Sequence, residues 1–337
     1  MTHKTQKDIM IENAVARVSK EIGLVANAQG IKIDIDTLTG IKAKVTEQKF
    51  YEIKPSDFMP VVVGENAWAD DILTWKSYST GDNFESGLVD TGSNSGRLAK
   101  ADTDIEGVKI PVKHWATEIG YNLMELAQAT RSGNFSVVDA KETARLKVWQ
   151  LGVQRSAFLG LDSVTSVKGL LTQDSVTLNT TTIAKNIKDM NATEFQAFIG
   201  NIMSDYFENS NSTTLPDTFV MPTDDFLGCV NSTDEAFPLK SRLERMKESF
   251  EAATGNANFE IKSLAYAQLE RNGLGLNRYV LYKRADDTSF RMDIPVDYTT
   301  TITDTVNGFS YQSVAYGSFS SAEAYRPAEM IYFDHAV

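Results

Sequence analysis

The chain has 337 residues, of which 42% are hydrophobic and 23% charged, so it is long enough to bury a sizeable core. Its formal net charge is −12, and an acidic surface repels phosphates, which argues against a protein that reads nucleic-acid sequence. A single cysteine, Cys229, excludes an intrachain disulfide and a cysteine-based zinc site. The chain has neither a run of about 20 apolar residues nor an N-terminal apolar segment, so we expect no membrane span and no signal peptide.

Residues 1–50 precede the first strongly apolar segment and are predicted to form an arm. Within them, residues 5–28 carry apolar side chains near helical spacing, which predicts a surface helix. Ile31–Ile35 alternates apolar and charged residues, as a short strand does. The sequence leaves open whether this arm packs on its own subunit or on another.

A polar excursion over residues 81–104 separates two strand-like segments. The apolar alternation around Val108 changes phase after His114, which indicates a bulge or a strong twist. Pro111 removes a hydrogen-bond donor and predicts an edge strand. The simplest structure is a long two-stranded hairpin that leaves from Trp75 and returns along Val108–Tyr121.

Such a hairpin needs a partner surface. An isolated two-stranded hairpin is marginally stable in water, and a long structureless excursion is unusual unless it is functional. Both difficulties disappear if the hairpin lies on a neighbouring copy of the same chain. The sequence therefore favours a protein that assembles with itself.

Two helices follow the hairpin, a short one over Asn122–Thr130 and a long one over Phe135–Gly160. The long helix is predicted to bury one apolar stripe. That stripe consists of Val137, Ala140, Ala144, Val148, Leu151 and Phe158, with Lys141, Arg145 and Lys147 on the solvent side.

The rest of the chain mixes helices and strands without a fixed repeat, which predicts an α+β fold. The expected helices are Ala192–Glu208 and Leu239–Ala253, and the expected strands include Phe219–Pro222, Phe259–Ile261, Tyr279–Tyr282, Phe290–Ile294 and a C-terminal segment within Tyr325–Phe333.

No catalytic, cofactor or metal site is predicted. The sequence has no zinc-protease, P-loop or nucleophile-elbow motif. The acidic pairs lack the ligand spacing of a calcium loop and indicate turns and helix caps; they are Asp34/Asp36, Asp102/Asp104, Asp224/Asp225 and Asp286/Asp287. We expect all four tryptophans, Trp68, Trp75, Trp115 and Trp149, to pack in the core. An α+β enzyme with residues 81–104 as a lid stays an alternative.

Four local stretches, taken in order, resemble one known family. They are Trp75-Lys76-Ser77-Tyr78 followed by Gly81, Ile119-Gly120-Tyr121 leading to Glu125, Ala157–Gly160 leading to Lys168–Leu171, and Arg326-Pro327-Ala328-x-Met330. With this order of elements the chain resembles tailed-bacteriophage major capsid proteins of the HK-ninety-seven-type fold. The resemblance implies an N-terminal arm (1–50), the start of a peripheral domain (51–75), an extended β-hairpin loop (76–121), a spine helix with peripheral domain (122–190), an apical domain (191–290) and C-terminal strands that return to both domains (291–337).

The resemblance also implies a function. Copies of the chain would form hexamers and pentamers of an icosahedral shell around double-stranded DNA, in a virion capsid assembled in the host cytoplasm. We expect a structural protein and no enzyme, with separate scaffolding and portal proteins, possible decoration proteins, and at most non-specific contact with DNA. An encapsulin-type compartment is an alternative within the same fold.

Six residues in or beside the excursion are predicted to contact a neighbouring subunit. The apolar Phe84, Leu88 and Leu98 would dock on it, Arg97 and Lys100 would pair with its acidic residues, and Lys109 lies beside them. The alternative is a surface loop with incidental apolar residues. Nothing in the sequence supplies an Asn partner or a Glu for a Lys100 or Lys109 isopeptide crosslink, so no crosslink is expected.

Overall fold

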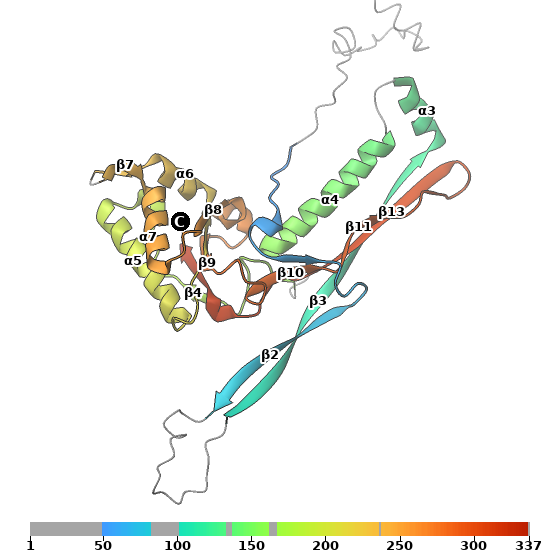
Figure 1. The fold of residues 1–337 in the computed structure, drawn as a ribbon. Coiled ribbons are helices and arrows are strands. Elements are labelled where there is room, and N and C mark those ends of the chain that lie inside the picture. The colour runs from blue at the N-terminus through green and yellow to red at the C-terminus, as the bar shows by residue number, and fades with distance from the viewer. Residues whose placement is uncertain (1–48, 82–100, 133–136, 162–166, 236, 336–337) are drawn as a thin grey trace, which may run out of the picture. The chain divides into compact units, whose positions relative to one another are not determined.

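The computed structural model describes residues 49–81, 101–132, 137–161, 167–235 and 237–335 (Figure 1). The chain divides into two units, residues 1–51 with 132–134, and residues 52–131 with 135–337. The account below concerns the second unit. The helix predicted over residues 5–28 and the strand predicted over Ile31–Ile35 lie outside the described residues.

The described residues mix helices with strands, as predicted for an α+β chain. The helices are α3 (Leu123–Ser132), α4 (Val137–Leu159), α5 (Ala192–Asn209), α6 (Thr223–Asn231), α7 (Arg242–Thr254) and α8 (Leu269–Asn272). The strands are β1 (Val61–Val63), β2 (Asp71–Gly81), β3 (Ala101–Asn122), β4 (Thr177–Asn179), β5 (Thr218–Pro222), β6 (Thr233–Asp234), β7 (Phe237–Ser241), β8 (Glu260–Leu264), β9 (Asn277–Tyr282), β10 (Phe290–Ile294), β11 (Val296–Thr300), β12 (Asp304–Thr305), β13 (Ser310–Ser320), β14 (Glu323–Ala324) and β15 (Met330–His335). Short 3₁₀ turns connect several of them.

The 22-residue strand β3 changes partners halfway along its length. Its first half, up to Pro111, pairs antiparallel with β2, and its second half, from Val112, pairs antiparallel with β13. The resulting sheet has the order β11-β13-β3-β2. The predicted hairpin is therefore confirmed, but it is formed by residues 71–81 and 101–111, and the return strand continues into the body.

One sequence prediction about β3 is wrong, and one of the two alternatives in another is excluded. Pro111 does not mark an edge strand, because β3 lies between β13 and β2 in the sheet. It lies where the ladder with β2 ends and the ladder with β13 begins, so its missing N–H interrupts neither ladder. The phase change after His114 is not a bulge, because both ladders run without a register shift, and the strong twist that the sequence offered as the alternative stays a prediction. The buried side of β3 changes close to the point where its partner changes from β2 to β13.

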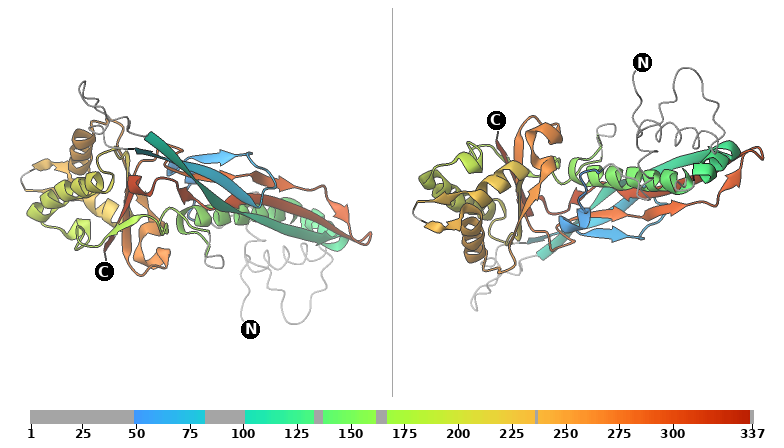
Figure 2. Two further views of the ribbon diagram at one scale, coloured as in Figure 1. Left: turned by 90° about the horizontal axis from the view of Figure 1, so that it is seen from below. Right: turned by 90° about the horizontal axis from the view of Figure 1, so that it is seen from above.

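Helix α4 lies along one face of this sheet (Figure 2). The Trp149 ring is 5.2 Å from the Trp115 ring and 6.0 Å from the Phe319 ring, measured between centroids. Gly317, opposite Trp115 in the β3–β13 ladder, makes room for it, because a Cβ there would come within 2.5 Å of the Trp149 ring. Helix and sheet are thus packed through aromatic rings.

The predicted buried stripe of α4 is partly wrong. Val148 is 56% exposed and Ala144 is exposed, whereas Arg145 is buried. The Arg145 guanidinium donates to the Ser313 carbonyl at 2.7 Å and to the Tyr298 hydroxyl at 3.0 Å. These acceptors from the sheet satisfy a buried cation, which is why the helix turns a polar side chain inward.

A second five-stranded sheet, in the order β4-β15-β9-β5-β8, is buried on both faces. Phe219 and Tyr279 face one cluster with Phe198 of α5 and Phe250 of α7, while Val220 and its neighbours face another cluster around α4. The predictions of α5 and of the strands in this sheet are confirmed. The helix expected from Leu239 begins only at Arg242, because Ser241 and Glu244 form its capping box.

Candidate assembly surface

The hairpin of β2 and β3 carries an uncovered apolar face. In its ladder Leu73 is opposite Lys109, Trp75 is opposite Gly107, and Ser77 is opposite Ile105. Because directly opposite residues share one face of an antiparallel pair, these side chains project to the same side. Leu73, Trp75 and Ile105 are 47%, 65% and 60% exposed. We call this set, with Gly107 and Lys109, the outer hairpin face.

Gly107 shapes this face. A Cβ at Gly107 would come within 3.2 Å of both Leu73 Cδ1 and Trp75 Cζ3. The two side chains therefore lie over the glycine backbone and form one continuous apolar surface. A large side chain at this position would push them apart.

The other face of the hairpin is anchored to the body. Ile72 and Ile110 are buried there, in one cluster with Val112 and Tyr325. At the base of the hairpin, alternate residues of β2 and β3 thus differ: Ile72 and Ile110 hold it in place, while Leu73 and Lys109 stay exposed.

Exposed carboxylates project mainly from the opposite side of the hairpin, because Asp102, Asp104 and Glu106 alternate with the residues of the outer hairpin face. Asp102, Asp104 and Glu106 lie on β3, and Asp71 begins β2, all of them exposed. The carboxylates of Asp102 and Asp104 accept hydrogen bonds from the next backbone N–H, at 2.8 and 2.9 Å. The expectation that this pair marks a turn is wrong, because both residues are within the strand.

The sequence found only part of this surface. Of the six predicted contact residues, Lys109 lies on the outer hairpin face; the others, Phe84, Leu88, Arg97, Leu98 and Lys100, lie outside the described residues. Sequence reasoning missed Leu73, Trp75 and Ile105, although the spacing of Leu73 and Trp75 places them on one side of a strand. The expectation of four core tryptophans is wrong for Trp75 and for Trp68, which is 68% exposed.

The buried carboxylate of Asp225 is a structural group. It accepts hydrogen bonds from the Ile187 backbone N–H at 3.0 Å and from the Tyr279 hydroxyl. Burial raises the pKa of this carboxyl, and the two hydrogen bonds oppose the shift. Asp225 lies in the first turn of α6, at the helix start that the sequence predicted, but its carboxylate does not cap that helix. In the described part of the chain, no three His, Cys, Asp or Glu side chains are grouped to hold a metal, and no helix is long and apolar enough to cross a membrane.

Comparison with known proteins identifies the family. A model described as major capsid protein matches residues 91–335. The chain belongs to the major capsid protein family. The match extends to the end of β15, so it includes β3, α4 and the whole of the second sheet, but not β2 of the first.

Solved structures show the fold of this major capsid protein. A chain from the capsid of Myoviridae phage XM1 is 17% identical with a TM-score of 0.73, covering 91% of this chain and 99% of that one. A chain of Microbacterium phage Oxtober96 is 7% identical with a TM-score of 0.57, covering 94% and 98%. One from the capsid of a native GTA particle is 11% identical with a TM-score of 0.55, covering 92% and 100%. A comparison with curated protein sequences finds no match.

These findings confirm the predicted family and the α+β phage-capsid fold. As a member of this family, the protein is a component of a capsid. The encapsulin alternative is not favoured by the family match, and the enzyme alternative has no support from it.

Proposed function

We propose that this major capsid protein assembles into hexamers and pentamers that close an icosahedral shell around double-stranded DNA. The observation that carries the proposal is the outer hairpin face, an exposed apolar surface on a hairpin that is anchored at its base by the buried Ile72 and Ile110. Apolar patches of this kind on soluble proteins mark interaction surfaces. The neighbouring subunit of the same shell would cover it.

The size of the contact is sufficient to drive assembly when it is repeated. A tryptophan buries about 150–250 Å² in a folded contact, so a 65% exposed Trp75 has roughly 100–160 Å² left to bury. At about 25 cal/mol per Å² this contributes about 2.5–4 kcal/mol per subunit before ordering costs are subtracted. Leu73 and Ile105 add to it.

The rest of the proposal concerns partners and location. The family resemblance supports a separate scaffolding protein, a portal, possible decoration proteins and assembly in the host cytoplasm. The net charge of −12 supports a container wall that touches DNA non-specifically if at all. The six domain boundaries given above, and neighbour contacts by Phe84, Leu88, Arg97, Leu98 and Lys100, are part of this proposal.

The test compares assembly of the full chain with that of a Leu73→Ser/Trp75→Ser variant, by light scattering and negative-stain electron microscopy over a concentration series. We expect the variant to need at least ~100-fold more protein for half-assembly, since about 2.7 kcal/mol corresponds to that factor. The control is Leu227→Ser, which removes a similarly exposed leucine from α6. Each variant should keep the thermal unfolding midpoint of the wild-type monomer.

Two results would contradict the proposal. One is a double variant that assembles at the wild-type concentration. The other is a wild-type chain that stays a 37.3 kDa monomer even when it is co-expressed with the other capsid proteins of its phage.

A further inference from the structure

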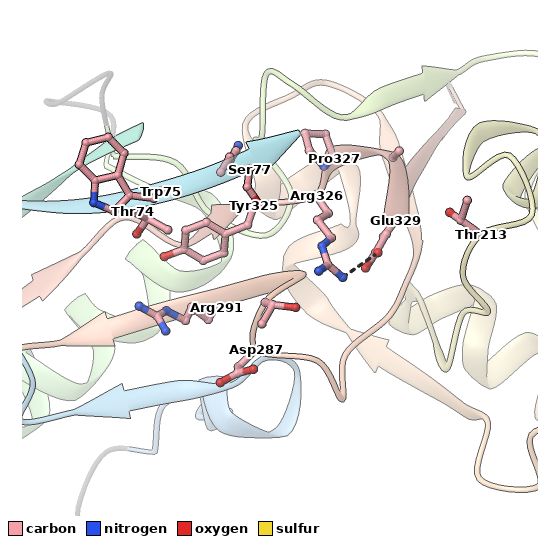
Figure 3. A pocket seen from close by; sticks show the side chains of 13 residues that line it. Thr74, Trp75, Ser77, Thr213, Asp287, Arg291, Tyr325, Arg326, Pro327 and Glu329 are labelled. Atoms are coloured by element: carbon pink, nitrogen blue, oxygen red, sulfur yellow. Dashed lines mark hydrogen bonds and ion pairs between the residues drawn. The ribbon is translucent and has the colours of Figure 1, made fainter. Parts of the chain in front are cut away.

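The pocket shown in Figure 3 carries arginines that are already paired within the subunit. The Arg326 guanidinium lies 3.3 Å from the Glu329 carboxylate and 3.8 Å from that of Asp286. The Arg291 side chain lies 3.3 Å from the Asp293 carboxylate. Because these cations have partners, this pocket gives no chemical indication of a ligand. A second pocket differs in this respect.

The second pocket lies on the face of the first sheet that is turned away from α4. Ala116 of β3 and Tyr316 of β13 are directly opposite in their ladder and share this face. They project away from the helix, because Ala116 alternates with Trp115, whose ring packs against Trp149 of α4. The pocket encloses about 340 Å³. Its lining also includes Trp68, His114, Val296 and Ser318. We call it the aromatic pocket.

Trp68 forms one wall of the aromatic pocket. Its ring centroid lies 5.6 Å from that of Tyr316, and the two ring planes meet at 36°. The residue is 68% exposed, so most of the indole is free to contact a ligand.

The backbone holds Trp68 in an unfavourable conformation. Its φ of +67° lies in the left-handed region, which bulky side chains rarely adopt. A turn closed by the Ala69 N–H, which donates to the Asn66 carbonyl at 3.1 Å, fixes this conformation. The chain thus keeps a large exposed ring at a position that favours glycine. Strained residues of this kind cluster at binding and active sites.

Two carboxylates flank the aromatic pocket. Glu118 is exposed and follows Ala116 on the same face of β3, where it is the diagonal neighbour of Tyr316. The Asp70 carboxylate lies 3.4 Å from His114 Nε2, and its side chain is 96% exposed. Among the described residues, the lining includes no lysine or arginine. Aromatic faces next to carboxylates are the chemistry that binds an organic cation.

We propose that the aromatic pocket binds the guanidinium group of an arginine on a basic partner protein. A planar guanidinium stacks on an indole face and donates paired hydrogen bonds to a carboxylate, so Trp68 and Glu118 suit it together. The net charge of −12 favours a basic partner, since a second copy of this chain would bring the same excess of carboxylates. The pocket belongs to one subunit, so the proposal does not depend on how subunits assemble.

The test is saturation-transfer NMR on the full-length chain, with the blocked tripeptide acetyl-Ser-Arg-Ser-amide as the probe. This readout follows the peptide protons and therefore serves free subunits and particles alike. We expect saturable binding that weakens with added salt. The same peptide with citrulline, which keeps the shape but not the charge, should bind at least about 5-fold more weakly.

Two exposed tryptophans give a matched pair of variants. Trp68→Gly should abolish binding without lowering the thermal unfolding midpoint, because glycine accepts the left-handed backbone. Trp75→Ser, which removes a 65% exposed indole from the outer hairpin face, should bind the peptide like the wild type.

A second pair of variants tests the charge and decides the question if Trp68→Gly impairs folding. Asp70→Asn/Glu118→Gln should weaken peptide binding about 5-fold, because both flanking carboxylates become neutral. Asp104→Asn/Glu106→Gln makes the same charge change at two exposed positions of the hairpin and should leave binding unchanged.

Four results would overturn the proposal. One is equal binding of the arginine and citrulline peptides, and another is wild-type binding by both pocket variants. A third is displacement of the peptide by spermidine at a lower concentration than the peptide itself requires, which would assign the pocket to a free polyamine. The fourth is loss of peptide binding in particles made of this chain alone, which would assign it to a second copy.

Discussion

Replacing Arg145 by methionine should destabilise the subunit far more than an equivalent change two residues along the same helix. The Arg145 side chain is 1% exposed and donates to the Ser313 carbonyl, the Tyr298 hydroxyl and the Glu142 carboxylate. Each hydrogen bond to a charged group contributes about 1.5–3 kcal/mol, but desolvation of the cation offsets much of the sum. Because Glu142 is 37% exposed and can be rehydrated, we expect a loss of about 3 kcal/mol, at the low end for a broken buried pair.

The measurement is urea unfolding followed by tryptophan fluorescence, since the buried Trp149 lies one turn from Arg145. Lys147→Met is the matched control. Lys147 is 28% exposed and pairs with a Glu52 that is 50% exposed, so its loss should change the free energy of unfolding by at most about 1 kcal/mol. If Arg145→Met and Lys147→Met unfold at the same urea concentration, the view of Arg145 as a satisfied buried cation is wrong.

Three further outcomes are expected. Gly317→Ala should lose about 1–3 kcal/mol of unfolding free energy in the same urea assay, because its Cβ meets the Trp149 ring, whereas Gly152→Ala, with open space around it, should gain about 0.5–1 kcal/mol. Burial raises the pKa of Asp225, so the contribution of this carboxyl to the free energy of unfolding is fully present below its unfolded-state pKa and is lost as pH rises through its folded-state pKa. The stability of the wild type relative to Asp225→Asn should therefore decline from about pH 4 upward. Urea titrations at successive pH values measure this difference. Burial raises the pKa of the Cys229 thiol to about 12, so a thiol reagent at pH 7 should label it only at the rate of unfolding, as followed by mass spectrometry.

Each of these outcomes has a control and a contrary result. Equal effects of the two glycine substitutions would contradict the packing of α4 on the sheet. Asp224→Asn, on the exposed side of the same helical turn, controls for the loss of one surface charge, and a pH-independent difference between wild type and Asp225→Asn would show that burial of this carboxyl has no cost. Fast labelling of Cys229 in the native subunit would mean that α6 opens without global unfolding.

The sequence predicted those helices and strands whose apolar side chains recur regularly within a single continuous segment. Helix α5 and the strands of the doubly buried sheet fall into this group, because their apolar side chains repeat with the period of the element. The family that the motifs indicated is also confirmed by the family match. Local pattern was sufficient in these cases.

The features that sequence reasoning missed depend on distant partners. Arg145 is buried because its acceptors come from strands 153 and 168 residues away, which the helical period cannot reveal. Trp75 lies opposite Gly107 on the outer hairpin face and is therefore exposed. Pro111 is tolerated inside a sheet because the two ladders of β3 meet beside it. Contacts by Phe84, Leu88, Arg97, Leu98 and Lys100 stay predictions.

The exchange of partners along β3 has a mechanical consequence. Because one unbroken strand forms both the hairpin and the middle of the sheet, a pull on the hairpin along its axis is transmitted through covalent backbone to the ladder with β13. The hydrogen bonds of that ladder run perpendicular to the strands, so 11 residue pairs would have to shear together before the hairpin could be drawn out. A hairpin closed by its own turn alone would instead unzip pair by pair.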